Sequence, residues 1–416
     1  MGIDSKLDVV VLCAAPITDQ NFRRMKLEIL TQHFSVTVFD ISQALGRVSM
    51  SNSSLNWPRV EKFSTFESLV SSLVELKPAY CFDYVGVGEG SDEVSRALRS
   101  AGVKQIAQRL GFQPYPPLNK RLIRFVRSLF SILIPKKSSE LRVRESNDQI
   151  LAPRRGGSVL ELLAPTVNRW KGLVHPPFAS LHGGKKTVDA FTRRSSHKFW
   201  VGADDYQAWQ ENETQPVSVS PTSGDRYAVF VDDALVLADD WSVLGLEPPV
   251  DERTYRSLIM STFEIFENQA GMPIVIAGHP SMASRADYAR LFGGREIIFN
   301  ATNSLVKDAQ VVLTHASTAV SFAVLNKKSI VLLTSSEIQR SHYGLSIAAL
   351  SRALKIRIHC MSVGGGAPIS IKPVNRHVYE RYVFNYLLGV PPGEQIGWQE
   401  LLKSITRIAE NFAASR

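Results

Sequence analysis

The sequence predicts an α/β protein made of two doubly wound halves, and three observations support this. The chain has 416 residues, which exceeds one ordinary hydrophobic core and fits two domains of comparable size. Short apolar, β-branched runs alternate with helix-like stretches in both halves, a pattern typical of parallel sheets covered by helices. A polar stretch with two prolines and several hydroxyl side chains, Asn212–Asp225, separates the halves and is interpreted as the linker.

The first half opens with a strand at Leu7–Ala14, followed by a helix at Asn21–Gln32 and a strand at Ser35–Ile41. A helix at Ser64–Leu76 and a strand at Ala79–Val85 continue the alternation. A GxGxG pattern comes next, at Gly86, Gly88 and Gly90. We interpret it as a tight turn, because a dinucleotide-binding loop is expected after the first strand of such a sheet.

The second half opens with a strand at Tyr227–Val231 and a helix at Thr254–Gln269. Further strands are predicted at Pro273–Ala277, Ala309–Leu313, Ser329–Leu333 and Ile356–Met361. Two terminal helices are predicted, at Val378–Leu388 and Trp398–Ala414, with a break between them at Gly389–Gly393. These helices could return to the first domain. The expected arrangement is GT-B-like, with a cleft between two Rossmann-type domains at 1–215 and 216–385 and a helical crossover at 386–416.

Composition narrows the class of protein. Hydrophobic residues make up 44% of the chain, no run approaches the ~20 apolar residues of a membrane-spanning helix, and the N-terminus lacks a basic segment ahead of an apolar core. Cys13, Cys81 and Cys360 lie far apart with no metal-type spacing, so we expect buried free thiols in a reducing compartment. The predicted location is the cytoplasm.

The formal charge of +9 calls for an anionic partner. Arg121, Arg124 and Arg127 recur at helical spacing among apolar residues in a stretch that ends at Phe130, which predicts a basic amphipathic helix. Anionic lipid of the inner leaflet would attract such a helix, although a packed helix with a solvated Arg face gives the same pattern. Nucleic acid is not expected, since no aromatic platform accompanies the charge.

Polar residues follow three strands of the second half, at the ends where parallel sheets place their ligands. Gly278, His279 and Pro280 follow one strand, and His315, Ser317 and Thr318 follow the next, where a helix is predicted at Thr318–Asn326. Ser335 and Ser336 come after the third strand, and together these groups predict one polar rim that binds a nucleotide-sugar phosphate. The hydroxyl residues also fit simple helix caps.

Asp232 and Asp233 follow the strand YAVFV directly. Consecutive residues of an extended chain point to opposite sides, so we expect one carboxylate to act and the other to orient or cap. Glycosyl transfer needs a carboxylate either as a general base or as a nucleophile that forms a covalent glycosyl intermediate. An Asp helix cap is the alternative, and the similar pair Asp239-Asp240 nearby makes the pattern less distinctive.

These residues resemble a known family. The order Asp232-Asp233-Ala234, His279-Pro280, then Ser317-Thr318 is similar to the acidic, HP and serine motifs of bacterial GT-B sialyltransferases and capsule enzymes, which use CMP-activated acidic sugars. Most of the chain looks like the retaining β-Kdo glycosyltransferase module of bacterial O-antigen and capsule polysaccharide synthases. Ala234 departs from the glycine of the sialyltransferase motif, which weakens the case for inverting sialyl transfer.

The resemblance implies Kdo transfer from CMP-Kdo, with retention and no metal or other cofactor, onto an undecaprenyl-diphosphate-linked glycan. Carried over by position, Asp232 is the nucleophile, His279 meets the CMP phosphate, and Ser317 and Thr318 lie at the phosphate-binding helix start. Candidate groups for the carboxylate of the substrate are Arg154, Arg155 and Lys185. Glu161 and Asp233 are further candidates for substrate binding, and Glu161 and His315 are candidates for the acid/base partner. The protein would be peripheral to the inner membrane of a Gram-negative bacterium, beside other glycosyltransferases of its pathway.

Other functions stay open at this stage. One is inverting transfer of another CMP-linked acidic sugar, with Asp232 as the base. Another is nucleotide-sugar 2-epimerisation, an activity found on the same architecture, which would release UDP without an acceptor. A further alternative is a non-catalytic glycan- or lipid-binding module, for which CMP binding would be unexpected.

Overall fold

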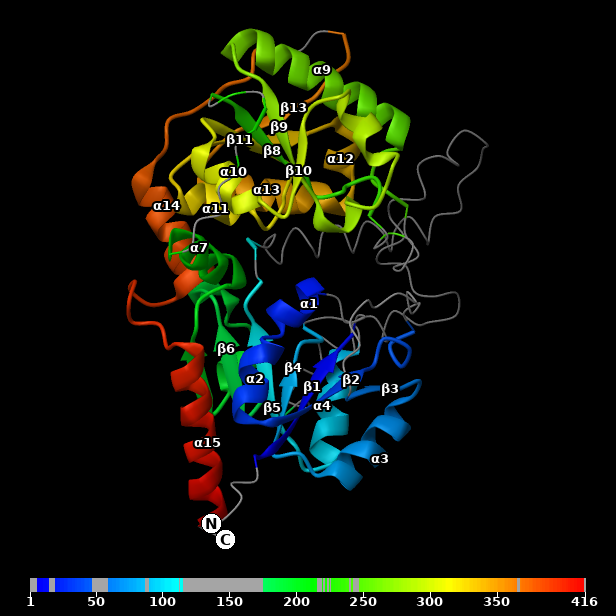
Figure 1. Ribbon diagram of the computed structural model, residues 1–416, viewed down its shortest axis with the longest axis vertical. Helices are drawn as coiled ribbons and strands as arrows, with labels where there is room; N and C mark the ends of the chain where they lie inside the picture. Colours follow the sequence, from blue (N-terminus) through cyan, green and yellow to red (C-terminus); the bar gives the residue numbers. More distant parts are fainter. Residues whose placement is uncertain are drawn as a thin grey trace, which may run out of the picture. The chain divides into compact units, whose positions relative to one another are not determined.

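A computed structural model describes residues 6–14, 19–46, 59–86, 90–111, 113–114, 175–214, 219, 221–222, 224, 226–238, 241, 247–364 and 367–414. Its contacts divide the chain into two compact units. The first comprises Met1–Leu110, Gly157–Asp204 and Leu388–Arg416, and the second comprises Gly111–Gly156 and Asp205–Leu387. Each unit contains a parallel sheet with helices on its faces (Figure 1).

The sheet of the first unit has the strand order β3-β2-β1-β4-β5-β6-β7 among the described residues, and all of its pairs are parallel. Its strands are β1 (Asp8–Cys13), β2 (Ser35–Asp40), β3 (Val60–Lys62), β4 (Tyr80–Asp83), β5 (Lys104–Arg109), β6 (Ala179–His182) and β7 (His197–Trp200). Its helices are α1 (Asp19–Arg24), α2 (Leu27–His33), α3 (Phe66–Leu76), α4 (Ser91–Ser100) and α15 (Trp398–Ala414), with 3-10 turns η2 (Lys185–Thr187) and η3 (Thr192–Arg194).

Alternation along the strands fills both faces of this sheet. Val9 and Val11 of β1 pack in one buried cluster with α2 and α15, and Val10 and Leu12 pack in another with α3 and α4. From α15, the first cluster takes Trp398, Leu401, Leu402 and Ile405. The hydroxyl of Tyr80 on β4 also donates to the carbonyl of Ile405, at 3.3 Å. The last helix of the chain is therefore part of the core of the first unit, as predicted, whereas the segment of the predicted helix at 378–388 belongs to the second unit up to Leu387.

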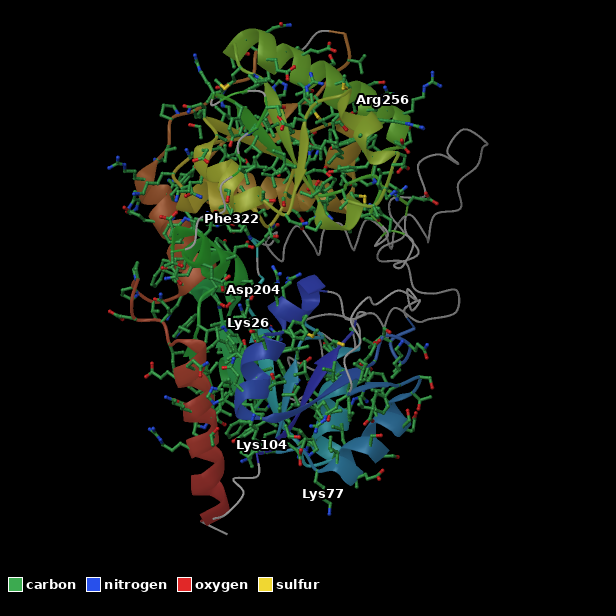
Figure 2. The ribbon with its side chains drawn as sticks, in the orientation of Figure 1. Lys26, Lys77, Lys104, Asp204, Arg256 and Phe322 are labelled. Carbon is green, nitrogen blue, oxygen red and sulfur yellow. The ribbon has the colours of Figure 1, made fainter. Side chains whose placement is uncertain are left out.

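Backbone signals set the ends of the helices. The predicted single helix at 21–32 is in fact two, because the chain turns at Lys26 in a left-handed conformation with φ of 53°. Helix α3 begins at a Thr65 cap and ends at Lys77, which has φ of 48° and points into solvent (Figure 2). The predicted turn after β4 contains Gly86 and Gly90, both with positive φ, whereas Gly88 lies outside the described residues.

The sheet of the second unit has the strand order β10-β9-β8-β11-β12-β13 among the described residues, again all parallel. Its strands are β8 (Ala228–Val231), β9 (Ile274–Gly278), β10 (Ile297–Phe299), β11 (Val311–Thr314), β12 (Ser329–Thr334) and β13 (Ile358–Cys360). Its helices are α7 (Asp204–Thr214), α9 (Glu252–Ala270), α10 (Thr302–Asp308), α11 (Val320–Leu325), α12 (Ser336–Arg340), α13 (His342–Leu354) and α14 (Arg376–Tyr382). Short turns are η4 (Pro280–Met282), η5 (Tyr288–Phe292) and the π-helical η6 (Val383–Leu388).

The unit boundaries fall near, but not at, the expected residues 215 and 385. Helix α7 belongs to the second unit from Asp205 onward because its side chains bond there. Trp209 Nε1 donates to Asn326 Oδ1 at 3.2 Å, and Ser304 Oγ donates to Asn212 Oδ1 at 3.0 Å. The chain returns to the first unit at Leu388. The next residue, Gly389, lies so close to Trp200 that a Cβ at this position would overlap the Trp200 ring.

Two Rossmann-like units, with the final helix packed on the first, have the element arrangement of the GT-B fold, and this confirms the predicted fold class. Cys13 and Cys81 are buried, but Cys360 is exposed, so its predicted burial is wrong; β13 is the edge strand of its sheet. Within the described residues, none of the helices has the length and apolar character needed to span a membrane. The predicted basic helix at 121–130 lies outside those residues.

Candidate functional site

The candidate site lies where the strand order of the second unit reverses. Strand β8 is first in the chain, β9 and β10 extend the sheet on one side of it, and β11, β12 and β13 extend it on the other. In open α/β sheets, ligands bind outside the carboxyl ends of the strands at such a switch point. The predicted polar rim was built from the ends of the strands now labelled β9, β11 and β12. In the structure β8 lies between β9 and β11, so Asp232 and Asp233 lie in the centre of the rim.

Asp232 is held on the β9 side of β8. Its backbone N–H continues the ladder by donating to the Ala277 carbonyl at 3.2 Å, and its side chain is 4% exposed. Oδ2 accepts hydrogen bonds from the backbone N–H of Ala234 at 3.0 Å and from the hydroxyl of Tyr288 at 2.7 Å. No described residue donates to Oδ1, so one carboxylate oxygen is fixed and the other remains for chemistry.

Asp233 faces the β11 side instead. Its Oδ2 accepts from the backbone N–H of Ala316 at 3.4 Å and from the hydroxyl of Tyr343 on α13. Its Oδ1 is buried and has no hydrogen-bond partner in the described part of the chain. The consecutive carboxylates thus have separate hydrogen-bond environments, as expected for neighbouring residues of an extended chain.

Burial makes both carboxyl groups weaker acids. Desolvation, followed by the charge of Asp233, raises the pKa of Asp232 to about 6, although hydrogen bonds from Tyr288 and Ala234 oppose the change. Desolvation likewise raises the pKa of Asp233 to about 7. The pair therefore releases its protons closer to neutral pH than ordinary carboxyl groups do. Such a pair can supply a nucleophile or a base near neutral pH.

We expect Asp233→Asn to stabilise the protein more at pH 8 than at pH 5. A carboxyl whose folded pKa is raised adds stability that is present below its unfolded value and lost as pH rises through the folded value. An amide does not ionise, so the gain at pH 8 should exceed the gain at pH 5 by on the order of 2 to 3 kcal/mol. Thermal unfolding at both pH values, with exposed Asp308→Asn as control, measures this difference. An equal change at the two pH values would contradict the expectation.

Ala234 closes the turn after the two aspartates in a left-handed conformation with φ of 52° and is 3% exposed. Ala234→Gly should change stability by less than about 1 kcal/mol, because relief of backbone strain is offset by greater freedom of the unfolded chain. Ala234→Val should cost more than about 2 kcal/mol, since a β-branched residue strongly disfavours positive φ. Denaturant unfolding of both variants tests this, and equal stabilities would show that the turn tolerates side-chain branching.

His279 follows β9 and caps η4, with Pro280 at the first position of that turn. Its Nδ1 accepts from the backbone N–H of Ser281 at 3.4 Å and lies 2.7 Å from the Ser281 hydroxyl. A neutral imidazole that accepts at Nδ1 carries its proton on Nε2, and no described residue bonds to that atom. The ring is therefore prepared to donate a hydrogen bond from Nε2 to an anion.

Gly278 has a packing role in this structure. A Cβ at this position would lie 2.6 Å from the ring of Phe299 and 2.9 Å from Ile297 Cγ2, both on β10. Only a glycine allows β9 and the side chains of β10 to approach so closely. The glycine thus shapes the strand end that presents His279.

His315 is in the core, behind the carboxylates. It is 0% exposed, its Nδ1 bonds to the carbonyl of Leu333 at 2.9 Å, and its Nε2 bonds to the Tyr255 hydroxyl at 2.9 Å. Burial is the main cause that lowers its pKa, so the neutral ring donates from Nδ1 and accepts at Nε2. Both nitrogens are therefore occupied, and His315 presents neither of them to a ligand.

The hydroxyl residues of the rim also bond locally. Ser317 Oγ accepts from the backbone N–H of Ala319 at 3.4 Å, Thr318 is exposed, and α11 begins only at Val320, two residues later than expected. Ser335 Oγ accepts from the N–H of Ile338 at 3.3 Å and so caps α12. Ser335 and Ser336 both donate to Glu337, at 2.8 and 2.9 Å. The cap interpretation accounts for Ser335.

The other predicted residues lie outside the described residues or in the first unit. Arg154, Arg155 and Glu161 lie outside the described residues. Lys185 is exposed on η2 of the first unit, with its Nζ 5.3 Å from the ring centroid of Trp200. Sequence reasoning missed Tyr288 and Tyr343, which bond to the two aspartates. Neither tyrosine belongs to a motif. Tyr288 follows His279 by nine residues, but this spacing is too common to identify a functional tyrosine from sequence.

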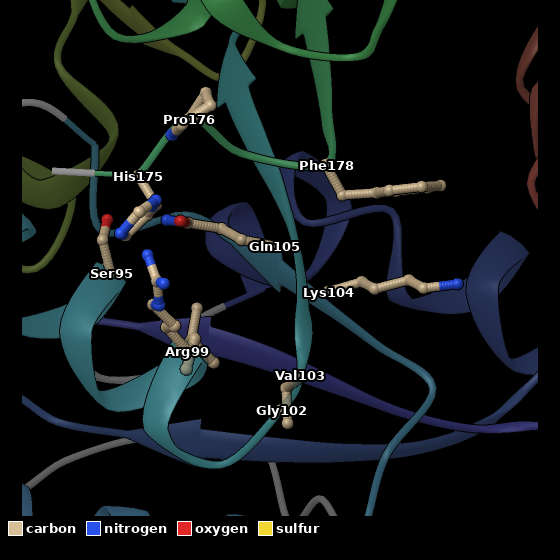
Figure 3. A pocket seen from close by; sticks show the side chains of 10 residues that line it. Ser95, Arg99, Gly102, Val103, Lys104, Gln105, His175, Pro176 and Phe178 are labelled. Carbon is tan, nitrogen blue, oxygen red and sulfur yellow. The ribbon is translucent and has the colours of Figure 1, made fainter. Parts of the chain in front are cut away.

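A cavity of about 340 Å³ in the first unit is separate from these residues (Figure 3). Arg99, Gln105 and His175 point toward its interior, whereas Lys104 and Phe178 point away. It adjoins α4 and the amino-terminal part of β5, the edge opposite to the one where doubly wound sheets bind ligands. Among all the residues that the structure describes, no group of three or more His, Cys, Asp or Glu side chains is placed to hold a metal ion.

Comparisons with known proteins give only distant structural similarities. No protein-family model and no curated protein matches the sequence. MurG of Acinetobacter baumannii is 11% identical, with 96% of this chain and 99% of that one covered and a TM-score of 0.45. A putative UDP-N-acetylglucosamine 2-epimerase of Listeria monocytogenes is 11% identical, with 99% and 98% covered and a TM-score of 0.44. A UDP-glucosyltransferase of Polygonum tinctorium is 10% identical, with 99% and 95% covered and a TM-score of 0.43. Similarities this distant do not indicate an activity.

Proposed function

We propose that the protein is a retaining glycosyltransferase that moves Kdo from CMP-Kdo to a lipid-linked glycan through a covalent adduct on Asp232. The observation that carries this proposal is the setting of Asp232 at the switch point. It lies at the end of β8, with Oδ2 held by Ala234 and Tyr288 and with Oδ1 bonded to no described residue. A buried carboxylate with one fixed and one available oxygen suits a nucleophile.

In the first step, Asp232 Oδ1 attacks the anomeric carbon of Kdo and forms a C–O bond. The bond from that carbon to the phosphate oxygen breaks, and CMP leaves with the bonding electrons. In the second step, an acceptor hydroxyl attacks the same carbon and loses its proton to a base, and the Asp232 carboxylate is released. Two inversions give net retention, so a β-Kdo donor gives a β-Kdo product.

The choice of CMP-Kdo rests on the sequence resemblance, namely the order of the acidic, HP and serine motifs. His279 Nε2–H would donate to the leaving phosphate, and no metal ion is required by the proposal. Lys185 and the arginines at 154 and 155 are candidates for the carboxylate of Kdo. An undecaprenyl-diphosphate-linked acceptor would place the protein at the inner face of the bacterial inner membrane, beside other enzymes of O-antigen or capsule synthesis.

Inverting transfer of another CMP-activated acidic sugar is the second candidate, and one observation favours it. Burial raises the pKa of Asp232 to about 6 and that of Asp233 to about 7, so either carboxylate suits a general base that takes the acceptor proton. In that reaction no adduct forms, and the anomeric configuration of the product is opposite to that of the donor.

Intact-protein mass spectrometry after mixing with CMP-Kdo alone tests the proposal. The expected result is an added mass of one Kdo residue in the wild type and none in Asp232→Asn. CMP-sialic acid and UDP-GlcNAc serve as donor controls, and UDP release from UDP-GlcNAc without an acceptor would identify an epimerase instead. Thermal stabilisation by CMP without an adduct would favour inverting transfer. No response to any cytidine nucleotide would refute the proposal.

A further inference from the structure

The hydroxyl of Tyr288 connects the two main parts of the candidate site. It donates to Asp232 Oδ2 at 2.7 Å and accepts from the backbone N–H of His279 at 3.2 Å. The side chain is 1% exposed, and its ring packs on Phe292 and Phe299 with centroid distances of 5.2 and 5.7 Å. Because the ring is enclosed, the hydroxyl is fixed in space and can hold its partners in register.

The three groups form a continuous chain from the strand end of β9 to that of β8. The His279 N–H donates to the Tyr288 oxygen, and the Tyr288 O–H donates to Asp232. The same histidine presents Nε2–H at the rim, because its Nδ1 is engaged with Ser281. The residue expected to contact the donor phosphate is therefore joined, through its own main chain and one hydroxyl, to the carboxylate expected to attack the sugar.

We propose that Tyr288 is a positioning residue that aligns Asp232 Oδ1 with a donor whose phosphate is bound at His279. This inference rests on the proposed function. Oδ2 is held by Tyr288 from one direction and by the Ala234 N–H from another, which sets the rotation of the carboxylate. Without the hydroxyl, only the Ala234 bond would orient it, and the reactive oxygen would be misplaced.

The protonation of Asp232 gives a second signature of this role. Burial, and then the charge of Asp233, raise the pKa of Asp232, whereas the hydrogen bonds from Tyr288 and Ala234 and the nearby His315 ring lower it. The hydroxyl of Tyr255 hydrogen-bonds to His315. Burial, and then the charges of both aspartates, raise the pKa of Tyr255. Removing the Tyr288 hydroxyl takes away a stabilising partner of the carboxylate, so the pKa of Asp232 should rise.

Tyr288→Phe is the test, because phenylalanine keeps the ring in its packing site. Tyr227→Phe is a matched control: this buried tyrosine of the same unit donates to the Leu305 carbonyl at 2.9 Å and precedes the opposite end of β8. The rate of adduct formation from CMP-Kdo is followed by quenched mass spectrometry from pH 5 to pH 9, and CMP affinity is measured by calorimetry.

We expect Tyr288→Phe to slow adduct formation on the order of 10- to 100-fold. The acidic limb of the pH profile should move upward by roughly half a unit to one unit. CMP affinity should stay within about threefold, and Tyr227→Phe should behave as wild type. If Tyr288→Phe matches Tyr227→Phe in rate and pH profile, the positioning role is wrong although the proposed function stands. If the wild type forms no adduct, the proposed function fails first, and the inference fails with it.

Discussion

Asp232→Asn should abolish sugar transfer while the protein stays folded. The amide oxygen of asparagine can still accept from Ala234 and Tyr288, but the side chain has no charge with which to attack an anomeric carbon. We expect the transfer rate with saturating donor and acceptor to fall by a factor on the order of 10³ or more. Because burial raises the pKa of Asp232, the variant should unfold at an equal or higher temperature than the wild type at pH 8.

Asp233→Asn is the control for this substitution, since it makes the same chemical change at the adjacent residue. It should retain the covalent adduct, because Asp233 bonds to Ala316 and Tyr343 and faces away from the Asp232 partners. Transfer by Asp232→Asn within tenfold of wild type would rule out Asp232 as the nucleophile. Loss of the adduct in Asp233→Asn alone would transfer that role to Asp233.

Leu401→Ala should destabilise the first unit strongly, although Leu401 lies almost 300 residues after β5 in the sequence. Its side chain is 0% exposed and packs in the cluster that contains Val9 and Val11. Removing a buried leucine side chain costs about 3 kcal/mol through lost transfer free energy and the cavity left behind. For a unit of this size, the unfolding temperature should fall by roughly 6 to 12 °C.

Lys403→Ala, on the exposed face of the same helix, separates loss of core packing from a general effect on α15. It should change stability by less than about 0.5 kcal/mol. Calorimetry of the two variants, together with hydrogen exchange in β1 and β4, locates the effect. Similar unfolding temperatures for the two variants would mean that α15 is not part of the core of the first unit.

Residue patterns along the chain predicted the class of the fold and the position of its principal carboxylates. The alternation of apolar runs and helical stretches depends on residues close in sequence, so it predicted the strands at 8–13, 228–231 and 329–334 to within a residue or two. Asp232 and Asp233 were recognised because they follow a buried strand directly, and the carboxyl end of a parallel strand is a place for ligands in any such sheet.

The surroundings of those residues, in contrast, depend on how the strands pair and the segments pack. Strand β8 lies between β9 and β11, although β9 and β11 follow it in the chain, and this order placed the aspartates between His279 and Ala316. In the same packing, His315 is buried and Ser335 caps a helix. Tyr288 and Tyr343 lie within hydrogen-bonding distance of the carboxylates. The physical reason is that strand pairing and side-chain contacts join residues from 9 to more than 100 positions apart, and periodicity within one segment carries no information about such partners.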